Sequence, residues 1–331
     1  MANKRMMKRT PLRWGIIGCG DVTEVKSGPA YQKTQGFELA AVARRDSEKV
    51  RDYAERHQVP KYYSEAQELI DDPDIDAIYV ATPPDTHGYY AKKVAESGRP
   101  CCVEKPFAPS HEESLSILES FRSADQPLFV AYYRRSLPRF NKVKEWIDGH
   151  LIGDVRHINW HLRKPATDTD LSKQYIWRTD AGIATAGYFD DLACHGLDLF
   201  VYLLGRIEDA QGISLNQQGL YSARDAVSAC WMHEGGATGS GSWNFGTRDR
   251  ADKVEILGSA GSIEFAVFDG SPLRLESEDT VEELFIDNPE NIQLPHVQNM
   301  REHLMGRSTH PSTGDTALHT AWVMDRILGR I

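Results

Sequence analysis

The chain has 331 residues, of which 40% are hydrophobic and 26% are charged, and its formal net charge is -10. This composition is ordinary for a globular protein, and the length predicts two domains. The acidic charge argues against binding to nucleic acid, and the absence of any run of about 18 apolar residues argues against a membrane span.

The start of the chain is basic, but no apolar stretch follows it. No signal peptide is therefore predicted in residues 1–9. The five cysteines are odd in number and form no C-x-x-C pair. This usage favours reduced thiols in a cytoplasmic protein over a secreted disulfide scaffold.

The first half of the chain alternates short apolar runs with helical patterns. Strands are predicted at 12–17, 37–43, 75–82, 101–103 and 128–132. Helices are predicted at 47–57, with Ser47 as the N-cap, and at 86–98 and 110–123. This alternation indicates βαβ units around a parallel sheet, and thus an α/β Rossmann domain over residues 1–131.

The second half has a different pattern. After a helix at 138–148, strands are predicted at 155–163, 226–233, 241–245, 254–257 and 262–267, with a last helix at 313–328. Glycine-rich turns between neighbouring strands indicate hairpins. Residues 132–331 are therefore predicted to form an α+β domain with a large, open, mostly antiparallel sheet, used for substrate binding and oligomerisation.

Gly18-Cys19-Gly20 directly follows the first predicted strand, where a dinucleotide-binding loop belongs. The first glycine permits a tight turn, and the second lets the backbone approach a pyrophosphate. Asp21 and Val22 continue this loop. Thr23 stands where a third glycine is usual, and Gly28-Pro29 follows, so the loop is predicted to be longer than usual.

Arg44 and Arg45 stand at the end of the second predicted strand, where an acidic residue usually holds the ribose 2′-hydroxyl of NAD. A guanidinium cannot accept that hydrogen bond, but it can grip a 2′-phosphate. The pair therefore favours NADP over NAD. Two solvated arginines are the simpler interpretation, and Asp46 is the nearby acid that would restore NAD binding.

Asp191, His195 and Asp198 are spaced i, i+4 and i+7, which puts them on one face of a helix. A histidine is a natural general base near neutral pH, and a neighbouring carboxylate can orient it or hold a substrate hydroxyl. A lysine can stabilise an alkoxide. An isolated D-x-x-x-H is more often a surface ion pair or a helix cap than a site, and Asp198 is the weaker candidate because a cap or a pairing with a neighbouring residue would also explain it. No third ligand accompanies Asp191 and His195, so no metal is predicted.

Seven motifs follow one another along nearly the whole chain, namely Gly18-Cys19-Gly20, residues 82–87 (TPPDTH), Glu104-Lys105-Pro106, residues 133–135 (YRR), 152–155 (IGDV), Trp177-Arg178 and 191–198 (DLACHGLD). Together they resemble the glucose–fructose oxidoreductase/inositol dehydrogenase (Gfo/Idh/MocA) family. The resemblance implies catalytic roles for Lys105, Asp191 and His195. The sequence departs from the family pattern at two places. The run of glycines usual before the aspartate reads Ala184-Thr185-Ala186-Gly187 here, and Ala193 stands where a glycine is usual two residues before the histidine.

The resemblance also implies softer candidates. Thr82, Pro83, His87 and Glu104, together with Lys105, are expected to bind the cofactor, although His87 is nearly as suited to a helix cap. Tyr133, Arg134, Trp177 and Arg178, with Asp191 and His195, are expected to bind substrate. The tryptophan is as often part of a core as of a sugar-binding surface.

These features predict an NADP-preferring dehydrogenase or reductase of a sugar, cyclitol or related polyol, with NAD as the other cofactor. One alternative is an NAD-dependent glycoside hydrolase of the same superfamily, which oxidises C3 transiently. Another is a non-catalytic NADP-binding regulator, against which the intact Lys105, Asp191 and His195 argue. The resemblance, more than the sequence itself, implies a homodimer or homotetramer, in which a second subunit would cover the broad bare sheet, since such a sheet is seldom left exposed.

Overall fold

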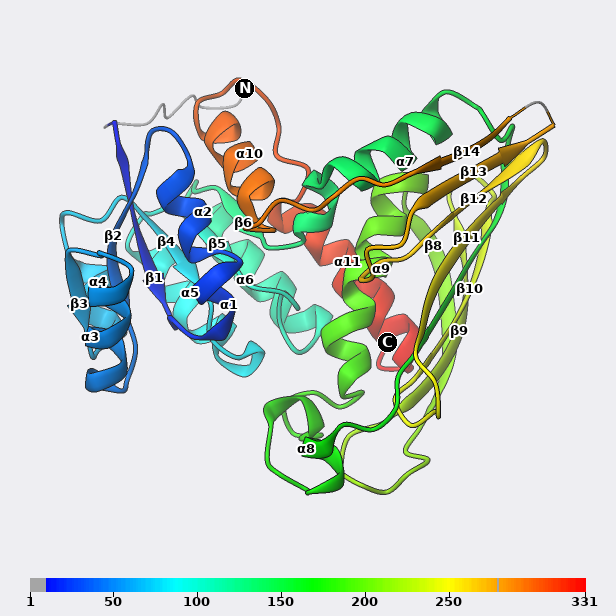
Figure 1. Ribbon diagram of the computed structural model, residues 1–331. Coiled ribbons are helices and arrows are strands. Elements are labelled where there is room, and N and C mark those ends of the chain that lie inside the picture. Colours follow the sequence, from blue (N-terminus) through cyan, green and yellow to red (C-terminus); the bar gives the residue numbers. More distant parts are fainter. Residues whose placement is uncertain (1–9, 279) are drawn as a thin grey trace. The chain divides into compact units, whose positions relative to one another are not determined.

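The computed structural model describes residues 10–278 and 280–331, and this part of the chain divides into two compact units (Figure 1). The first unit runs to Leu137 and includes residues 289–318, and the second comprises residues 138–288 and 319–331. The chain thus first crosses between units a few residues after the predicted boundary at 131. The return of residues 289–318 to the first unit differs from the predicted division, because it depends on non-local packing that no local pattern encodes.

Two expectations concern the start of the chain and the membrane. The absence of a signal peptide was predicted for residues 1–9, which lie outside the described residues. In the described part of the chain, no helix is both long and apolar enough to span a bilayer.

The first unit is built on a six-stranded sheet whose strand order is β3-β2-β1-β4-β5-β6. All its neighbouring strands are parallel, as the sequence predicts. The strands are β1 (Leu12–Ile17), β2 (Phe37–Ala43), β3 (Lys61–Tyr63), β4 (Ala77–Val80), β5 (Cys101–Val103) and β6 (Leu128–Val130). The order reverses between β1 and β4, which is where ligands bind in sheets of this kind.

Helices α1 (Asp21–Val25), α2 (Gly28–Lys33), α3 (Ser47–Arg56), α4 (Ala66–Asp71), α5 (His87–Glu96), α6 (His111–Ser123) and α10 (Leu294–Leu304) belong to the first unit. The predicted N-cap of α3 was wrong by one residue. Asp46, not Ser47, caps this helix, because its carboxylate accepts a hydrogen bond from the backbone N–H of Lys49 at 3.1 Å.

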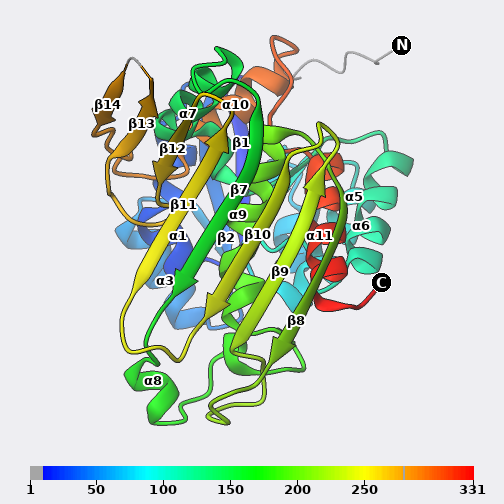
Figure 2. The same ribbon diagram turned by 90° about the vertical axis from the view of Figure 1, so that its right-hand side faces the viewer.

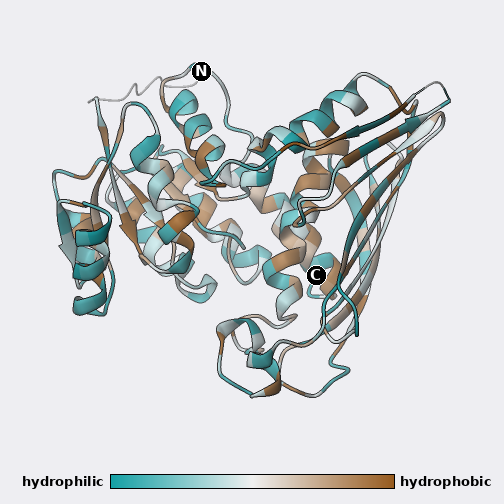
Figure 3. Ribbon diagram, in the orientation of Figure 1, coloured by the Kyte–Doolittle hydropathy of each residue, from teal (hydrophilic) through white to brown (hydrophobic). Residues whose placement is uncertain are grey.

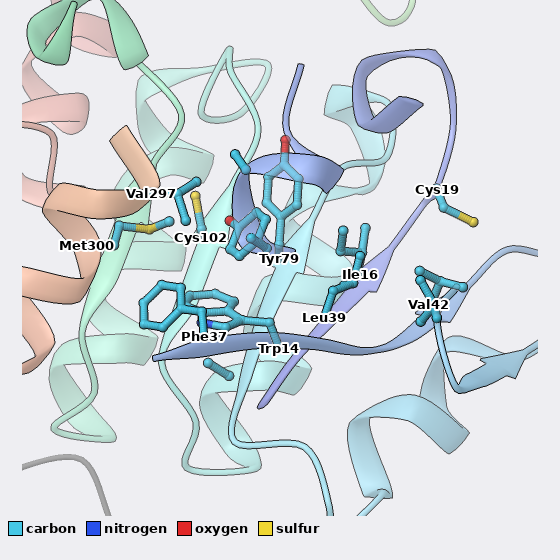
Figure 4. Packing of buried hydrophobic residues seen from close by; sticks show 14 of the residues in the cluster. Trp14, Ile16, Cys19, Phe37, Leu39, Val42, Tyr79, Cys102, Val297 and Met300 are labelled. Atoms are coloured by element: carbon cyan, nitrogen blue, oxygen red, sulfur yellow. The ribbon is translucent and has the colours of Figure 1, made fainter. Parts of the chain in front are cut away.

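The core of the first unit contains residues from both ends of the chain (Figure 4). Trp14 and Phe37 pack with ring centroids 5.4 Å apart. Val297 and Met300, from α10, are fully buried in the same cluster. Burial of these apolar side chains explains why a segment remote in sequence returns to the parallel sheet.

The second unit is built on an eight-stranded sheet whose order is β14-β13-β12-β11-β7-β10-β9-β8. Its strands are β7 (Val155–Arg163), β8 (Ile207–Leu215), β9 (Ala226–His233), β10 (Thr238–Asn244), β11 (Ala251–Gly258), β12 (Gly261–Phe265), β13 (Leu273–Ser277) and β14 (Val281–Leu284). The predicted hairpins β9–β10 and β11–β12 are confirmed. All pairs are antiparallel except β7 and β10, so the sheet is mostly antiparallel, as predicted.

One face of this sheet is covered by α7 (Pro138–Asp148), α9 (Tyr188–Leu204) and the part of α11 (Gly314–Leu328) that belongs to the second unit (Figure 2). In β7, Ile158, Trp160 and Leu162 are buried, while His157 and His161 on the opposite face are not. The other face carries no helix of the described chain. Coloured by hydropathy in Figure 3, α3 of the first unit is largely hydrophilic, whereas hydrophobic residues gather on α9 of the second unit.

Candidate active site

The loop after β1 makes the tight turn that its glycines predict. Gly18 has a φ of +92°, and a Cβ there would lie 2.7 Å from the side chain of Thr82, so only glycine fits. A Cβ on Gly20 would meet no atom nearer than 3.9 Å, so the loop is open at this position. Asp21 and Val22 form the first turn of α1, exposed and half-buried respectively.

Thr23, in place of the third glycine, is buried and folds back onto the loop. Its hydroxyl donates to the carbonyl oxygen of Gly20 at 2.7 Å. The glycine that permits close packing is instead Gly28, where a Cβ would lie 2.4 Å from both the Thr23 carbonyl oxygen and the Tyr53 hydroxyl. Helix α2 begins there, with Pro29 in its first turn. The loop is therefore longer than the usual pattern, although the short α1 precedes the later helix.

The two arginines at the end of β2 differ in their surroundings. Arg44 is half-buried, and its Nη1 donates to the carbonyl oxygen of Cys19 at 2.9 Å, so its guanidinium lies at the glycine loop. Arg45 is exposed. The carboxylate of Asp46 is engaged in capping α3 and in an ion pair with Lys49 at 3.4 Å.

The loops after β4 and β5 are joined by a buried histidine. His87 is fully buried, with Nε2 2.8 Å from the carbonyl oxygen of Thr82 and Nδ1 3.1 Å from that of Pro106. Burial lowers the pKa of His87, while the backbone carbonyls favour its protonated form. Pro83, between these loops, is exposed. His87 thus positions the loops on which Thr82 and Lys105 stand.

Glu104 and Lys105 follow β5 and point to different environments. Glu104 is 5% exposed, and its Oε1 accepts hydrogen bonds from the Tyr79 hydroxyl at 2.6 Å and from Gln293 Nε2 at 2.7 Å. Its Oε2 accepts the backbone N–H of Lys105 at 3.0 Å. Lys105 is half-buried. The carboxylate therefore anchors the lysine's backbone to the core, and Gln293 is a participant that no sequence motif indicated.

Tyr133 and Arg134 begin a short 3-10 helix, Tyr133–Ser136, in the first unit. Both are buried, with relative exposures of 6% and 4%, and the Arg134 guanidinium lies 5.0 Å from the centre of the Tyr133 ring. Their stacking fixes the two side chains against each other.

In the second unit, α9 places the predicted carboxylate and histidine on one face. Asp191 and His195 are buried, with relative exposures of 5% and 4%, and they stand one helical turn apart. The His195 ring meets Phe268 edge-on, with centroids 5.8 Å apart. Asp198 is fully buried and accepts a hydrogen bond from the Thr320 hydroxyl at 2.9 Å, which agrees with the weaker, pairing role considered for it.

Trp177 and Arg178 lie beside this helix. The Arg178 Nε donates to Asp191 Oδ2 at 2.6 Å, and its guanidinium lies 4.3 Å from the centre of the Trp177 ring. Arg178 and Asp191, which were predicted as separate candidates, therefore form one ion pair in the structure. A planar guanidinium that stacks on an aromatic face while pairing with a carboxylate is held firmly in place.

Lys164, which no motif indicated, stands directly after β7 in the same unit. Burial lowers the pKa of Lys164, and the charges of Arg250, Asp191, Asp170 and Arg178 also act on it. The local sequence offered one signal, because Lys164 precedes Pro165 at a strand end, as Lys105 precedes Pro106.

A cavity of about 340 Å³ in the second unit is lined by Thr169, Asp170, Lys173, Gln174, Tyr175, Thr179, Asp180, Leu220, Tyr221 and Ser222, and none of these is a residue that the sequence predicted for the site. Its size falls within the range of small-molecule sites. Across residues 10–278 and 280–331, no group of three or more histidine, cysteine, aspartate or glutamate side chains is arranged to hold a metal ion.

The first unit fits a nicotinamide dinucleotide. Gly18 gives the required turn, Gly20 leaves space beside the loop backbone, and Arg44 places a cation there. These features suit an anionic pyrophosphate at the switch point of a parallel sheet.

Two family models match the chain. The model described as "Oxidoreductase family, NAD-binding Rossmann fold" matches residues 12–132, and the GFO/IDH/MocA C-terminal domain matches residues 140–264. Oxidoreductase P35 of Formosa agariphila is 33% identical over 319 residues, covering 96% of this chain and 98% of that protein. Levoglucosan dehydrogenase of Pseudarthrobacter phenanthrenivorans is 28% identical over 216 residues, which cover 61% of this chain but only 52% of that enzyme.

Solved structures share the whole architecture. An oxidoreductase from Agrobacterium radiobacter, in complex with NAD+, L-tartaric acid and magnesium, superimposes with a TM-score of 0.85 at 20% identity, covering 97% of this chain and 96% of that one. Levoglucosan dehydrogenase in complex with NADH and levoglucosan gives a TM-score of 0.85 at 22% identity, with 96% of each chain covered. At these identities the likeness shows the fold alone.

Proposed function

The chain belongs to the GFO/IDH/MocA oxidoreductase family, and from this we propose that it prefers NADP and acts on a secondary alcohol or ketone of a sugar, cyclitol or related polyol. The observation that carries the substrate class is the buried Asp191 and His195 on one face of α9, with Arg178 paired to the carboxylate. A bound nicotinamide supplies the acceptor or donor of a hydride.

In the oxidative direction, His195 takes the proton of the substrate hydroxyl as general base. Asp191, held by Arg178, orients the histidine or holds a substrate hydroxyl. The ammonium of Lys105 stabilises the negative charge that develops on the substrate oxygen. Reduction follows the same proton path in reverse.

Other residues serve binding on this proposal. Gly18, Gly20, Asp21 and Val22 would hold the pyrophosphate, while Thr82 and Pro83 would flank the nicotinamide side. His87 and Glu104 would contribute by fixing the loops of that site, since their polar atoms are engaged within the protein. Tyr133, Arg134, Trp177 and Arg178 would contact substrate.

The preference for NADP is supported by the end of β2. Arg44 lies at the glycine loop, Arg45 is exposed, and the carboxylate of Asp46 is occupied by α3 and Lys49. This leaves cations, and no free carboxylate among these three residues, where a ribose 2′-substituent would lie. Such an environment suits a 2′-phosphate better than a 2′-hydroxyl.

A homodimer or homotetramer is proposed from the bare face of the eight-stranded sheet. Ile213 and Leu215 on β8 are exposed, at 71% and 53%, and burying such side chains against a second copy would stabilise an assembly. Light scattering would give the mass in solution. A cytoplasmic location is proposed because all five cysteines are free and four of them are buried.

The proposed reaction is tested by supplying a panel of sugars, cyclitols and their oxidised forms with NADP(H) and with NAD(H), and following the nicotinamide absorbance. Lys105→Met should lower kcat by roughly 10²–10³-fold while the Kd for the cofactor stays close to that of the wild type. Unchanged turnover would refute the assigned mechanism, and a higher kcat/KM with NAD would refute the arginine argument. Hydrolysis of a glycoside with no net change in cofactor would instead identify the glycoside hydrolase alternative.

A further inference from the structure

Lys164 is a half-buried cation on a firmly held piece of backbone in the second unit. Its backbone N–H donates to the carbonyl oxygen of Asn244 at 2.9 Å, and its carbonyl oxygen accepts from Thr247 at 3.2 Å. These bonds extend the pairing of β7 and β10 past the strand ends. The side chain therefore starts from a fixed position rather than from a mobile loop.

The ammonium of Lys164 forms no ion pair within the described residues. It lies 5.8 Å from the centre of the Tyr188 ring, at the first residue of α9. The tyrosine hydroxyl in turn donates to Asp170 Oδ1 at 2.8 Å. Burying an ammonium without a paired anion costs free energy, so an anionic ligand that paired with the half-buried Lys164 would be stabilised there.

The charged groups around Lys164 are already engaged elsewhere. Asp191 is paired with Arg178 at 2.6 Å, and Arg250 is paired with Asp269. Asp170 accepts hydrogen bonds from the Thr167 backbone at 2.8 Å and the Thr167 hydroxyl at 2.7 Å, in addition to that of Tyr188. Within this group, Lys164 is the cation that makes no ion pair, while the Asp170 carboxylate has only neutral hydrogen-bond donors and its charge acts on Lys164.

Arg178, whose charge acts on Lys164, has hydrogen-bond donors to spare. Only its Nε contacts Asp191, so its two terminal nitrogens have no hydrogen-bond partner in the described protein. Because Asp191 balances the Arg178 charge and the Asp170 carboxylate also acts on Lys164, the net positive charge that Lys164 and Arg178 offer to a ligand is no more than one. A carboxylate, with a single negative charge, matches this better than a doubly charged phosphate.

We propose that Lys164, assisted by the terminal nitrogens of Arg178, binds a carboxylate on the substrate, so that the substrate is a sugar acid. This inference rests on the proposed function, since it names the substrate class of the same site. The cavity lined in part by Asp170, whose charge acts on Lys164, and by Thr179, which follows Arg178 in the chain, would take further hydroxyl-bearing parts of such a molecule. Lys164 is thus a specificity residue rather than a proton-transfer group.

The test compares matched acidic and neutral sugars on the full-length protein with saturating NADP+ and, separately, NAD+. D-glucuronate and D-galacturonate are paired with D-glucose and D-galactose, and D-glucose 6-phosphate represents the phosphate case. Binding is measured by calorimetry and turnover by nicotinamide absorbance. The variants are Lys164→Met, Lys164→Arg and, as a control that also removes one positive charge, Lys253→Met on β11.

We expect the wild type to favour the uronates over their neutral partners. Lys164→Met should weaken uronate binding roughly 10- to 100-fold, as for a hydrogen bond between charged groups, and change binding of the neutral sugar by less than about threefold. Lys164→Arg should recover most of the affinity, and Lys253→Met should behave like the wild type.

Several results would overturn the inference: no uronate binding by the wild type, equal losses for acidic and neutral sugars in Lys164→Met, or a preference for D-glucose 6-phosphate. Turnover restricted to neutral sugars would refute the inference and leave the proposed function intact. Uronate binding that depends on Lys164 without any redox turnover would support a carboxylate site at Lys164 and refute the proposed function.

Discussion

Two clusters of polar side chains, one in each unit, differ in how completely their hydrogen-bonding groups are satisfied within the protein. In the first unit, the buried carboxylate of Glu104 accepts hydrogen bonds from Tyr79, Gln293 and the backbone of Lys105. In the second, Lys164 forms no ion pair in the described protein, and Arg178 uses only its Nε. A fully hydrogen-bonded network makes its side chains rigid, whereas donors without a partner in the protein are available to bind a ligand. The comparison separates residues that position from residues that bind.

The largest expected effect comes from removing the proposed general base of the second unit, His195. His195→Asn keeps a polar side chain but removes the general base, and kcat should fall roughly 10²–10⁴-fold. The change is measured by steady-state kinetics on a substrate found in the panel. His157→Asn, on the bare face of the sheet, is the control and should keep wild-type activity. If His195→Asn stays within threefold of the wild type, the histidine is not the base.

Acid should lower the stability of the first unit through protonation of its histidines. Three histidines, namely His296 and His303 on α10 and His310 after it, lie where α10 packs in the first unit. Burial lowers the pKa of all three, that of His310 to about 4. Because these rings are neutral when folded and have an unfolded pKa near 6.5, the unfolded chain binds more protons below that pH. Stability is therefore fully present above about pH 6.5 and is lost as the pH falls towards 4, by roughly 3 kcal/mol for His310.

Urea unfolding at several pH values between 7 and 4, followed by circular dichroism, measures this loss. His310→Gln removes the titrating ring and should flatten the pH dependence while lowering stability at pH 7. An unfolding free energy in the wild type that stays constant from pH 6.5 to 4.5 would contradict the linkage.

A smaller effect is expected from opening the fully hydrogen-bonded network itself. Gln293→Leu removes one donor from the buried Glu104 carboxylate, and the free energy of unfolding should fall by roughly 1.5–3 kcal/mol. Turnover should also fall, because the anchor of the Lys105 backbone loosens. Gln298→Leu, on the exposed side of α10, is the matched control. Equal stability of the two variants would show that the amide of Gln293 contributes nothing to the network.

Much of this architecture follows from the sequence, because local patterns carry it. Strands β1, β2 and β5 and helix α7 have the predicted bounds, since periodicity and glycine or proline signals are read within a few residues. The same holds for the turn at Gly18 and for the shared helical face of Asp191 and His195. Family motifs added Lys105, which spacing alone would leave as a solvated lysine.

Only the tertiary structure decided which distant segments meet. It returned residues 289–318 to the parallel sheet, put Gln293 on the Glu104 carboxylate, paired Arg178 with Asp191, and made Asp46 the cap of α3. It also left Lys164 half-buried beside α9. The physical reason is that burial and charge matching are sums over neighbours in space, and those neighbours are fixed by packing that a single local stretch of sequence does not specify.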